Sequence, residues 1–242
     1  MKKVIGILGG MGPEATLDCF GKIIRSTPAR KDQDHLRIVI DNNPNVPDRT
    51  SAIIGDGESP VPVVVEGCNV LEKAGADFII IPCVSAHFFL SEIQGRIHLP
   101  ILSIFDAVSE TIKRDHSAIK TVGLLGTTGT IKGGLFQNRL AEDGISTLVP
   151  NEAAQSRIMA AIYDIKKAQP SRPRSEITAD IVAAAESLIF RKHDAAQAIV
   201  AGCTEIPLAL KQEDLSVPYF DSLTILARAA VLRAGLNPVP LS

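Results

Sequence analysis

The chain has 242 residues, 45% of them hydrophobic, and a formal net charge of -2. This length suits one large α/β domain or two domains of ordinary size. The charge, without any basic run, argues against a nucleic-acid partner, and no segment approaches the roughly 18 uninterrupted apolar residues of a membrane span.

The N-terminus superficially resembles a signal peptide, because Lys2 and Lys3 precede an apolar run. Glycines and Pro13 break that run, and no small-residue cleavage site follows it. We therefore interpret it as a first strand and expect a cytoplasmic protein. The four cysteines form no Cys-x-x-Cys pair and are expected to be reduced.

The first half alternates strands and helices. Strands are expected at residues 3–8, 36–41, 78–81 and 101–104, and helices at 13–26, 62–73, 86–94 and 106–114. Pro13 suits the first turn of its helix, and Gly75 suits a helix end. The alternation with short links predicts a doubly wound parallel sheet. Residues 42–50, rich in proline and asparagine, are expected to form a loop over the active face.

The order then starts again. Residues 121–130 repeat the pattern of the first strand and turn, about 120 residues later. Helices are expected at 133–142, 155–167, 175–192 and 223–234, with a strand at 198–201. The same spacing separates Cys83 from Cys203 and Pro100 from Pro218, which indicates an internal duplication.

The duplication predicts two similar flavodoxin-like α/β halves related by a pseudo-twofold axis, with the active site in the cleft between them. The expected N-terminal domain comprises residues 1–105 plus 219–242, and the C-terminal domain comprises 106–218. The last helix is expected to pack back on the first half.

The turn after the first strand contains Gly10-x-Gly12-x-x-Ala15, a loose match to a dinucleotide-binding fingerprint, and Asp41 could be its ribose-binding acid. Glu14 lies where a pyrophosphate would need to be, and the turn recurs around Gly126. Plain turn geometry explains the glycines about as well.

Two cysteines follow buried strands at matching positions of the two halves. Cys83 follows residues 78–81, and Cys203 follows residues 198–201. Such a pair could place thiols on opposite faces of one small ligand, so that one takes a proton from a carbon centre while the other returns one. Cys83 and His87 also have the spacing of a helical ligand pair. No further ligand set supports a metal, and a local hydrogen bond of His87 is the favoured reading.

The chain resembles the aspartate/glutamate racemase family, in its aspartate racemase branch. The motifs that carry this resemblance are Gly9-Gly-Met-Gly-Pro-Glu-Ala-Thr16, Asn42-Asn-Pro with Pro47-Asp-Arg-Thr50, Ile81-Pro-Cys-Val-Ser-Ala-His87, Leu125-Gly-Thr-Thr-Gly-Thr130, Ile162-Tyr163 with Lys166, and Gly202-Cys-Thr-Glu-Ile-Pro207. The resemblance implies an aspartate racemase with Cys83 and Cys203 as paired acid and base. It also implies a homodimer that needs neither pyridoxal phosphate nor a metal.

The same motifs imply a substrate-binding set: Met11, Gly12, Asn43, Arg49, Val84, Ser85, Thr127, Lys166, Thr204 and Glu205. Arg49 and Lys166 are the candidates for the distal carboxylate of the substrate, and Ser85, Thr127 and Thr204 are candidate hydroxyl donors to its α-carboxylate. Val84 departs from the asparagine usual in the family. The departure leaves glutamate or another amino acid open as the substrate.

Two further alternatives stay open. One cysteine could act alone, as a nucleophile or as the sole acid/base, as in related isomerases and decarboxylases. Alternatively, the chain could be a dinucleotide-dependent or non-catalytic binding protein.

Overall fold

The computed structural model describes residues 2–240. These residues form two compact units. The first unit holds the residues up to 107 together with those from 223 onward, and the second holds residues 108–222. Each unit has a buried apolar cluster, and one candidate cysteine belongs to each cluster: Cys83 in the first and Cys203 in the second.

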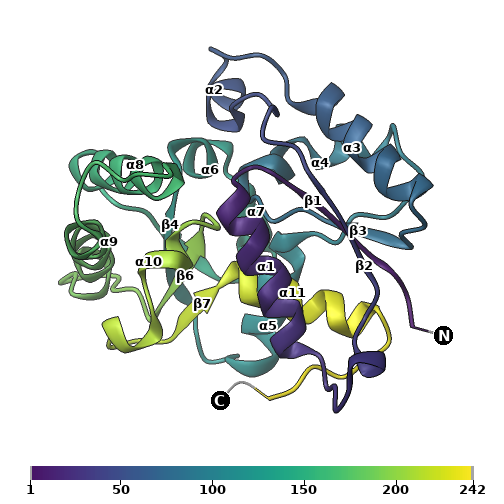
Figure 1. The fold of residues 1–242 in the computed structure, drawn as a ribbon. Coiled ribbons are helices and arrows are strands. Elements are labelled where there is room, and N and C mark those ends of the chain that lie inside the picture. Colours follow the sequence, from purple (N-terminus) through teal and green to yellow (C-terminus); the bar gives the residue numbers. More distant parts are fainter. Residues whose placement is uncertain (1, 241–242) are drawn as a thin grey trace. The chain divides into compact units, whose positions relative to one another are not determined.

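The first unit is built on a parallel sheet of order β2-β1-β3 (Figure 1). Its strands are β1 (Ile5–Gly9), β2 (Ile38–Asn42) and β3 (Phe78–Ile80), and Ile101 adds an isolated bridge to Ile79. Its α-helices are α1 (Pro13–Ser26), α2 (Arg49–Ile54), α3 (Val61–Lys73) and α4 (Leu90–Gln94), with 3-10 turns η1 (Asp32–Asp34) and η2 (Ser85–Phe89). Two longer helices, α5 (Ile104–Asp115) and α11 (Ser222–Arg233), start at the unit boundaries or cross them.

The second unit repeats this plan with a parallel sheet of order β5-β4-β6-β7 (Figure 1). Its strands are β4 (Thr121–Gly126), β5 (Ser146–Leu148), β6 (Ala198–Gly202) and β7 (Tyr219–Asp221). Its helices are α6 (Thr128–Gly133), α7 (Leu135–Glu142), α8 (Glu152–Lys166), α9 (Arg174–Ile189) and α10 (Ile206–Ala209), with the 3-10 turn η3 (Gln212–Asp214). The long helices α8 and α9 lie side by side.

The two sheets confirm the predicted fold class, an α/β fold with duplicated parallel sheets. In each sheet the first strand of the unit is central, the second lies at one edge, and the third lies on the other side. The third strands, β3 and β6, deliver the two cysteines. Because both strands are parallel to their neighbours, both cysteines follow carboxyl ends, where ligands bind in open α/β folds.

Local sequence explains several element boundaries. Pro13 stands at the first turn of α1, and α1 has its predicted bounds. Helix α3 ends before Gly75, which has a φ of +88°, and the Ala76 N–H donates to the Leu71 carbonyl at 3.1 Å. This is the left-handed helix end that the glycine predicted.

Other boundaries differ from the prediction. The loop expected at residues 42–50 ends early, because the Asp48 carboxylate accepts the Ser51 N–H at 2.8 Å and starts α2 at Arg49. The strand expected at 101–104 is reduced to the Ile101 bridge, since α5 already begins at Ile104. The helix expected from residue 86 begins as the 3-10 turn η2.

Short elements of the second unit were not predicted. These are α6, β5 and α10, none longer than six residues. Residues 219–221, which the sequence analysis assigned to the first half, form β7 and pair with β6. The domain division itself stays a prediction.

The last helix packs on the first unit, as expected. The Lys3 N–H donates to the Ala234 carbonyl at 3.1 Å, and the Arg233 guanidinium lies 5.5 Å from the centre of the Phe78 ring. The tail after α11 is held as well, since the Val239 N–H donates to the Ser26 carbonyl at 3.0 Å. The C-terminal segment therefore completes the first unit.

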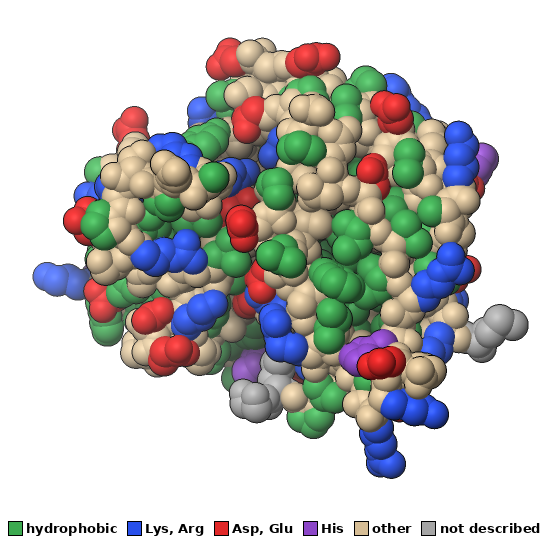
Figure 2. All heavy atoms as spheres, viewed as in Figure 1, with side chains coloured by type: hydrophobic (Ala, Val, Ile, Leu, Met, Phe, Trp, Pro, Cys, Tyr) green, Lys and Arg blue, Asp and Glu red, His purple; other side chains and the backbone are tan. Residues whose placement is uncertain are grey.

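A shallow apolar hollow lies between α1 and β2. Figure 2 shows apolar side chains (green) gathered beside α1 and over β2. The hollow is lined by Phe20, Ile23, Ile24, Thr27, His35, Leu36 and Ile38. None of these residues belongs to the predicted site.

Candidate active site

The two candidate cysteines have the same setting in their own units. Each thiol-bearing residue is 5% exposed and lies just beyond the carboxyl end of a fully buried strand, β3 for Cys83 and β6 for Cys203. The main chain turns sharply at both points, with the Cys83 N–H donating to the Ile81 carbonyl at 2.8 Å and the Ile206 N–H to the Cys203 carbonyl at 3.2 Å.

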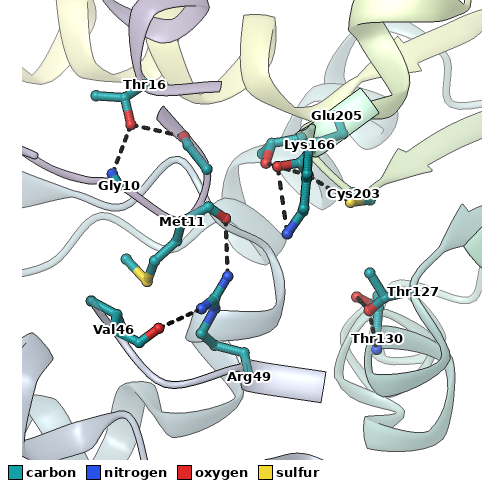
Figure 3. Close-up of polar contacts among 12 residues, drawn as sticks. Gly10, Met11, Thr16, Val46, Arg49, Thr127, Thr130, Lys166, Cys203 and Glu205 are labelled. Atoms are coloured by element: carbon teal, nitrogen blue, oxygen red, sulfur yellow. Dashed lines mark hydrogen bonds and ion pairs between the residues drawn. The ribbon is translucent and has the colours of Figure 1, made fainter. Parts of the chain in front are cut away.

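Cys203 is part of a polar chain of three side chains. Its thiol donates a hydrogen bond to Oε2 of Glu205 at 2.9 Å, and Oε1 of the same carboxylate lies 3.6 Å from Nζ of Lys166. Figure 3 shows both groups converging on the Glu205 carboxylate. The Thr204 hydroxyl also donates to Oε2, at 3.4 Å. The carboxylate thus connects the thiol to a cation on the last turn of α8.

This setting holds Cys203 in its protonated form. Burial raises the pKa of the thiol well above its ordinary value, and the neighbouring Glu205 charge raises it further. The Lys166 charge acts in the opposite direction. In the resting protein, Cys203 is therefore the thiol, with its proton directed at the Glu205 carboxylate.

The Cys83 segment is arranged differently. The next residue, Val84, is 2% exposed and apolar, and Ser85 is buried. His87 does not hydrogen-bond the thiol: its Nδ1–H donates to the Cys83 carbonyl at 2.9 Å, and its ring lies edge-on to Phe105. Burial lowers the pKa of the imidazole, so His87 is neutral and holds the main chain around Cys83. The local hydrogen bond favoured from the sequence is present.

The Arg49 guanidinium donates its hydrogen bonds to main-chain carbonyls of its own unit. Its Nη1 donates to the carbonyls of Val46 and Pro47 at 3.0 and 2.9 Å, and its Nη2 donates to the Met11 carbonyl at 3.3 Å (Figure 3). The residue is 8% exposed, and its buried Nε has no hydrogen-bond partner among the described residues. The guanidinium therefore ties the loop after β2 to the turn after β1.

The glycine-rich turn after β1 is closed on itself. The Gly10 N–H donates to the Thr16 hydroxyl at 3.0 Å, and that hydroxyl donates to the Gly12 carbonyl at 3.1 Å. Gly10 has a φ of +95°, and a Cβ there would lie 2.2 Å from the Asn43 carbonyl oxygen. The glycine is required by this close approach of two main-chain segments, which explains the turn without a dinucleotide.

Thr127 begins α6 in the second unit. Its hydroxyl caps that helix by accepting the Thr130 N–H at 3.0 Å, and it lies 3.1 Å from the Thr130 hydroxyl. The Gln155 side-chain amide donates to the Gly126 carbonyl at 2.9 Å and holds the end of β4. Thr127 is thus positioned at the carboxyl end of the central strand, as Met11 and Gly12 are in the first unit.

The structure therefore connects some members of the predicted set and not others. In the first unit, Arg49 contacts Met11, while Asn43 accepts the Asn45 N–H. In the second unit, Lys166, Cys203, Thr204 and Glu205 form one connected group. Sequence reasoning assigned Glu205 to substrate binding and missed its hydrogen bond with the catalytic candidate Cys203. The signal that could have found it is the acid two residues after the cysteine.

No metal centre or membrane segment is found in the described part of the chain. Among residues 2–240, no group of three or more His, Cys, Asp or Glu side chains is placed to hold a metal ion. No helix in this range is long and apolar enough to cross a bilayer.

Known proteins share both the sequence pattern and the fold. Residues 8–230 match the profile of the family described as Asp/Glu/hydantoin racemase. The broad-specificity amino-acid racemase RacX of Bacillus subtilis is 30% identical over 236 residues, which cover 94% of this chain and 96% of RacX.

Two solved structures extend this likeness to the whole fold. The Picrophilus torridus aspartate racemase has a TM-score of 0.85 and 30% identity, over 98% of this chain and 96% of its own. An aspartate racemase homologue from Pyrococcus horikoshii OT3 has a TM-score of 0.73 and 29% identity, over 97% of this chain and 99% of its own. The chain therefore belongs to the Asp/Glu/hydantoin racemase family of isomerases.

Proposed function

We propose that this protein interconverts L- and D-aspartate by proton transfer at Cα, with Cys83 and Cys203 as the two acid/base groups and without pyridoxal phosphate. The observation that carries the proposal is the pair of buried thiols at the carboxyl ends of equivalent strands, β3 and β6. The similarity to aspartate racemases over nearly the whole chain supports the choice of aspartate.

The reaction needs a base on one face of the substrate Cα and an acid on the other. One thiolate accepts the Cα proton, and the opposite thiol donates its own proton, so the carbon is inverted and the enzyme ends with its proton on the other sulfur. The raised pKa of Cys203 supports its role as the donor in the resting enzyme. In the reverse direction Cys203 is the base and Cys83 is the proton donor. Where Cys203 starts as the thiol, its proton must first move away, and Glu205, at 2.9 Å, is the neighbouring acceptor.

The remaining predicted residues are proposed to bind the substrate. Arg49 and Lys166 would hold the distal carboxylate, and the hydroxyls of Ser85, Thr127 and Thr204 would bind the α-carboxylate. The turn at Met11 and Gly12, together with Asn43, would bound the site. For Arg49 this role requires the guanidinium to give up part of its bonding to main-chain carbonyls.

A broader substrate range is the second candidate, and two observations favour it. Val84 offers no hydrogen bond where the family usually has an amide, and RacX, of comparable identity, has broad specificity. Under this alternative the same two thiols would act on several amino acids.

Chiral chromatography of the purified protein with L- and D-aspartate, glutamate and alanine tests the proposal. We expect each aspartate enantiomer to be converted to the racemate, with deuterium from D₂O entering at Cα and no effect of a reagent that traps pyridoxal phosphate. A faster reaction with alanine than with aspartate would establish the broader racemase instead. Absence of turnover with all three amino acids would refute both.

The expected homodimer and cytoplasmic location also stay proposals. Light scattering coupled to gel filtration would measure the mass in solution against the 25.8 kDa chain. A monomeric mass at assay concentration would refute the dimer without touching the proposed chemistry.

A further inference from the structure

One carboxylate joins a candidate catalytic thiol to a candidate substrate-binding cation. Oε2 of Glu205 accepts the Cys203 proton at 2.9 Å, and Oε1 faces Lys166 at 3.6 Å (Figure 3). We propose that the Lys166–Glu205 ion pair locks the proton on Cys203 until the distal carboxylate of a substrate draws Lys166 away. This inference rests on the proposed racemase function and makes Lys166 a positioning residue for the thiol.

The lock follows from where the negative charge resides. The Cys203–Glu205 pair holds one proton and one negative charge, whichever of the two atoms carries the proton. When the proton is on sulfur, the charge is on the carboxylate that Lys166 pairs with. When the proton is on Oε2, the charge is on sulfur and that ion pair is lost. Lys166 therefore favours the first arrangement, in which Cys203 cannot act as a base.

The two partners of the ion pair differ in their exposure to solvent. The Lys166 side chain is 24% exposed, whereas that of Glu205 is 3% exposed. The distance of 3.6 Å is also longer than the roughly 2.8 Å of a hydrogen-bonded ion pair. A dissolved carboxylate can therefore reach Lys166 and replace Glu205 as its partner, while Glu205 stays beside the thiol.

Release changes the proton position without any other reactant. The S–H bond of Cys203 breaks and an O–H bond forms at Oε2 of Glu205. The Cys203 thiolate then accepts the substrate Cα proton, and a protonated Cys83 donates its proton to the opposite face of the carbon. Glu205 afterwards loses its proton to solvent, and Cys83 regains one from solvent. Aspartate and glutamate carry a distal carboxylate that can release the lock, whereas alanine does not. The protein would thus discriminate between substrate side chains through the rate of proton transfer as well as through binding affinity.

The lock can be measured on the resting protein through the reactivity of Cys203. Methyl methanethiosulfonate, a small thiolate-selective reagent, would be reacted between about pH 5 and pH 10, with modification of the Cys203 peptide followed by mass spectrometry. The variants are compared by the shape of their pH profiles, that is, by the ratio of the rate at about pH 6 to the rate at about pH 10 in the same protein, because this ratio does not depend on access to the thiol. The proteins compared are wild type, Lys166→Met and the charge-conserving Lys166→Arg.

We expect Lys166→Met to raise the rate below about pH 7 by roughly three- to tenfold, equivalent to at most one pKa unit. The alkaline rise should move to higher pH in the same variant, because Lys166 lowers the pKa of Cys203. The two curves then cross, and Lys166→Arg should follow wild type. A neutral rate that is unchanged or lower in Lys166→Met overturns the lock.

Repeating the comparison in the Glu205→Gln variant tests whether the effect of Lys166 on the reaction rate of Cys203 passes through Glu205. Without the carboxylate there is no proton acceptor, so Lys166→Met should now lower the rate at neutral pH instead of raising it. The same sign in both backgrounds would mean that Lys166 acts on the thiol directly, and would refute the relay.

Turnover separates this inference from the proposed function. With Lys166→Met, kcat for alanine should rise by about three- to tenfold while kcat for aspartate falls. Wild-type protein that racemises no amino acid refutes the function, whereas active protein with parallel losses on aspartate and alanine refutes the lock alone.

Discussion

The two thiol-bearing strand ends have the same main-chain position and different chemical surroundings. At Cys203 the next two residues, Thr204 and Glu205, carry polar groups that meet at one carboxylate. At Cys83 the next residue is the buried Val84, and His87 hydrogen-bonds the main-chain carbonyl of Cys83. Among residues 2–240, no side chain hydrogen-bonds the Cys83 thiol, whereas Glu205 does so at Cys203.

Duplication thus explains why the thiols match, and later divergence explains why they need not act alike. A sheet repeated with the same strand order places both cysteines at carboxyl ends. The side chains that follow each cysteine then decide where its proton is held. The proposed mechanism uses one base and one acid at any moment. The surroundings that raise the pKa of Cys203 fit the role of acid in the resting protein.

The two cations differ in the same way. Arg49 of the first unit donates to three main-chain carbonyls, which stabilises a loop. Lys166 of the second unit pairs with a side-chain carboxylate next to a thiol. A planar, always-charged guanidinium suits the first task, and a mobile ammonium suits an ion pair that must exchange.

The largest effect is expected from removing either thiol. Cys83→Ser and Cys203→Ser should each lower kcat for aspartate by about 10²- to 10⁴-fold, because a serine hydroxyl is a far weaker acid and base. Chiral chromatography would measure both rates. Cys68→Ala, which removes another buried thiol of the first unit, should retain activity within about threefold. Near-normal turnover by either serine variant would contradict the two-thiol comparison.

Glu205→Gln should have the next largest effect, because it removes the proposed proton acceptor beside Cys203. We expect kcat/KM to fall about 10- to 100-fold, equally in both directions since L- and D-aspartate have equal free energies. The alkaline limb of activity should move to lower pH, because the carboxylate is a cause of the raised pKa of Cys203. Ser85→Ala, at the equivalent position after Cys83, should cost less than about fivefold. Equal losses of kcat/KM in Glu205→Gln and Ser85→Ala would contradict the proposed difference between the two thiol sites.

Val84→Asn would make the first strand end polar like the second. A new hydrogen bond to the α-carboxylate should lower KM for aspartate about five- to tenfold, the value of roughly 1–1.5 kcal/mol. Melting temperature should fall by a few degrees, because a buried valine is replaced by an amide. The mirror variant, Thr204→Val, should raise KM. A rise in KM with Val84→Asn would show that the valine belongs to this substrate site.

The smallest effect concerns stability. Arg49→Lys should lower the free energy of unfolding by about 1–3 kcal/mol, because a lysine cannot satisfy all three carbonyls of Val46, Pro47 and Met11. Thermal unfolding would measure a decrease of a few degrees. Arg191→Lys, at an exposed position of the second unit, is the matched control and should melt like wild type. Unchanged melting of Arg49→Lys would mean that the loop does not depend on the guanidinium.

Patterns in the sequence were sufficient for most of the longer elements. Helix α1 has its predicted bounds, and α3, α8, α9 and α11 lie within a few residues of theirs, because each has an apolar face and a proline or glycine near an end. The elements that the sequence did not predict are short. Strand β5 has three residues and a single partner, β4, so no periodic signal distinguishes it from a loop.

The sequence by itself determined the α/β fold, its duplication and the two matched cysteines. Strand periodicity, turn residues and a repeat of about 120 residues can all be recognised from the order of residues along the chain. Only the tertiary structure decided what each candidate side chain contacts. Arg49 meets a carbonyl 38 residues away, and Lys166 of α8 reaches Glu205 beyond β6. Such contacts depend on how separate elements pack, and no spacing along the chain encodes them. The proton on Cys203 is held by that packing.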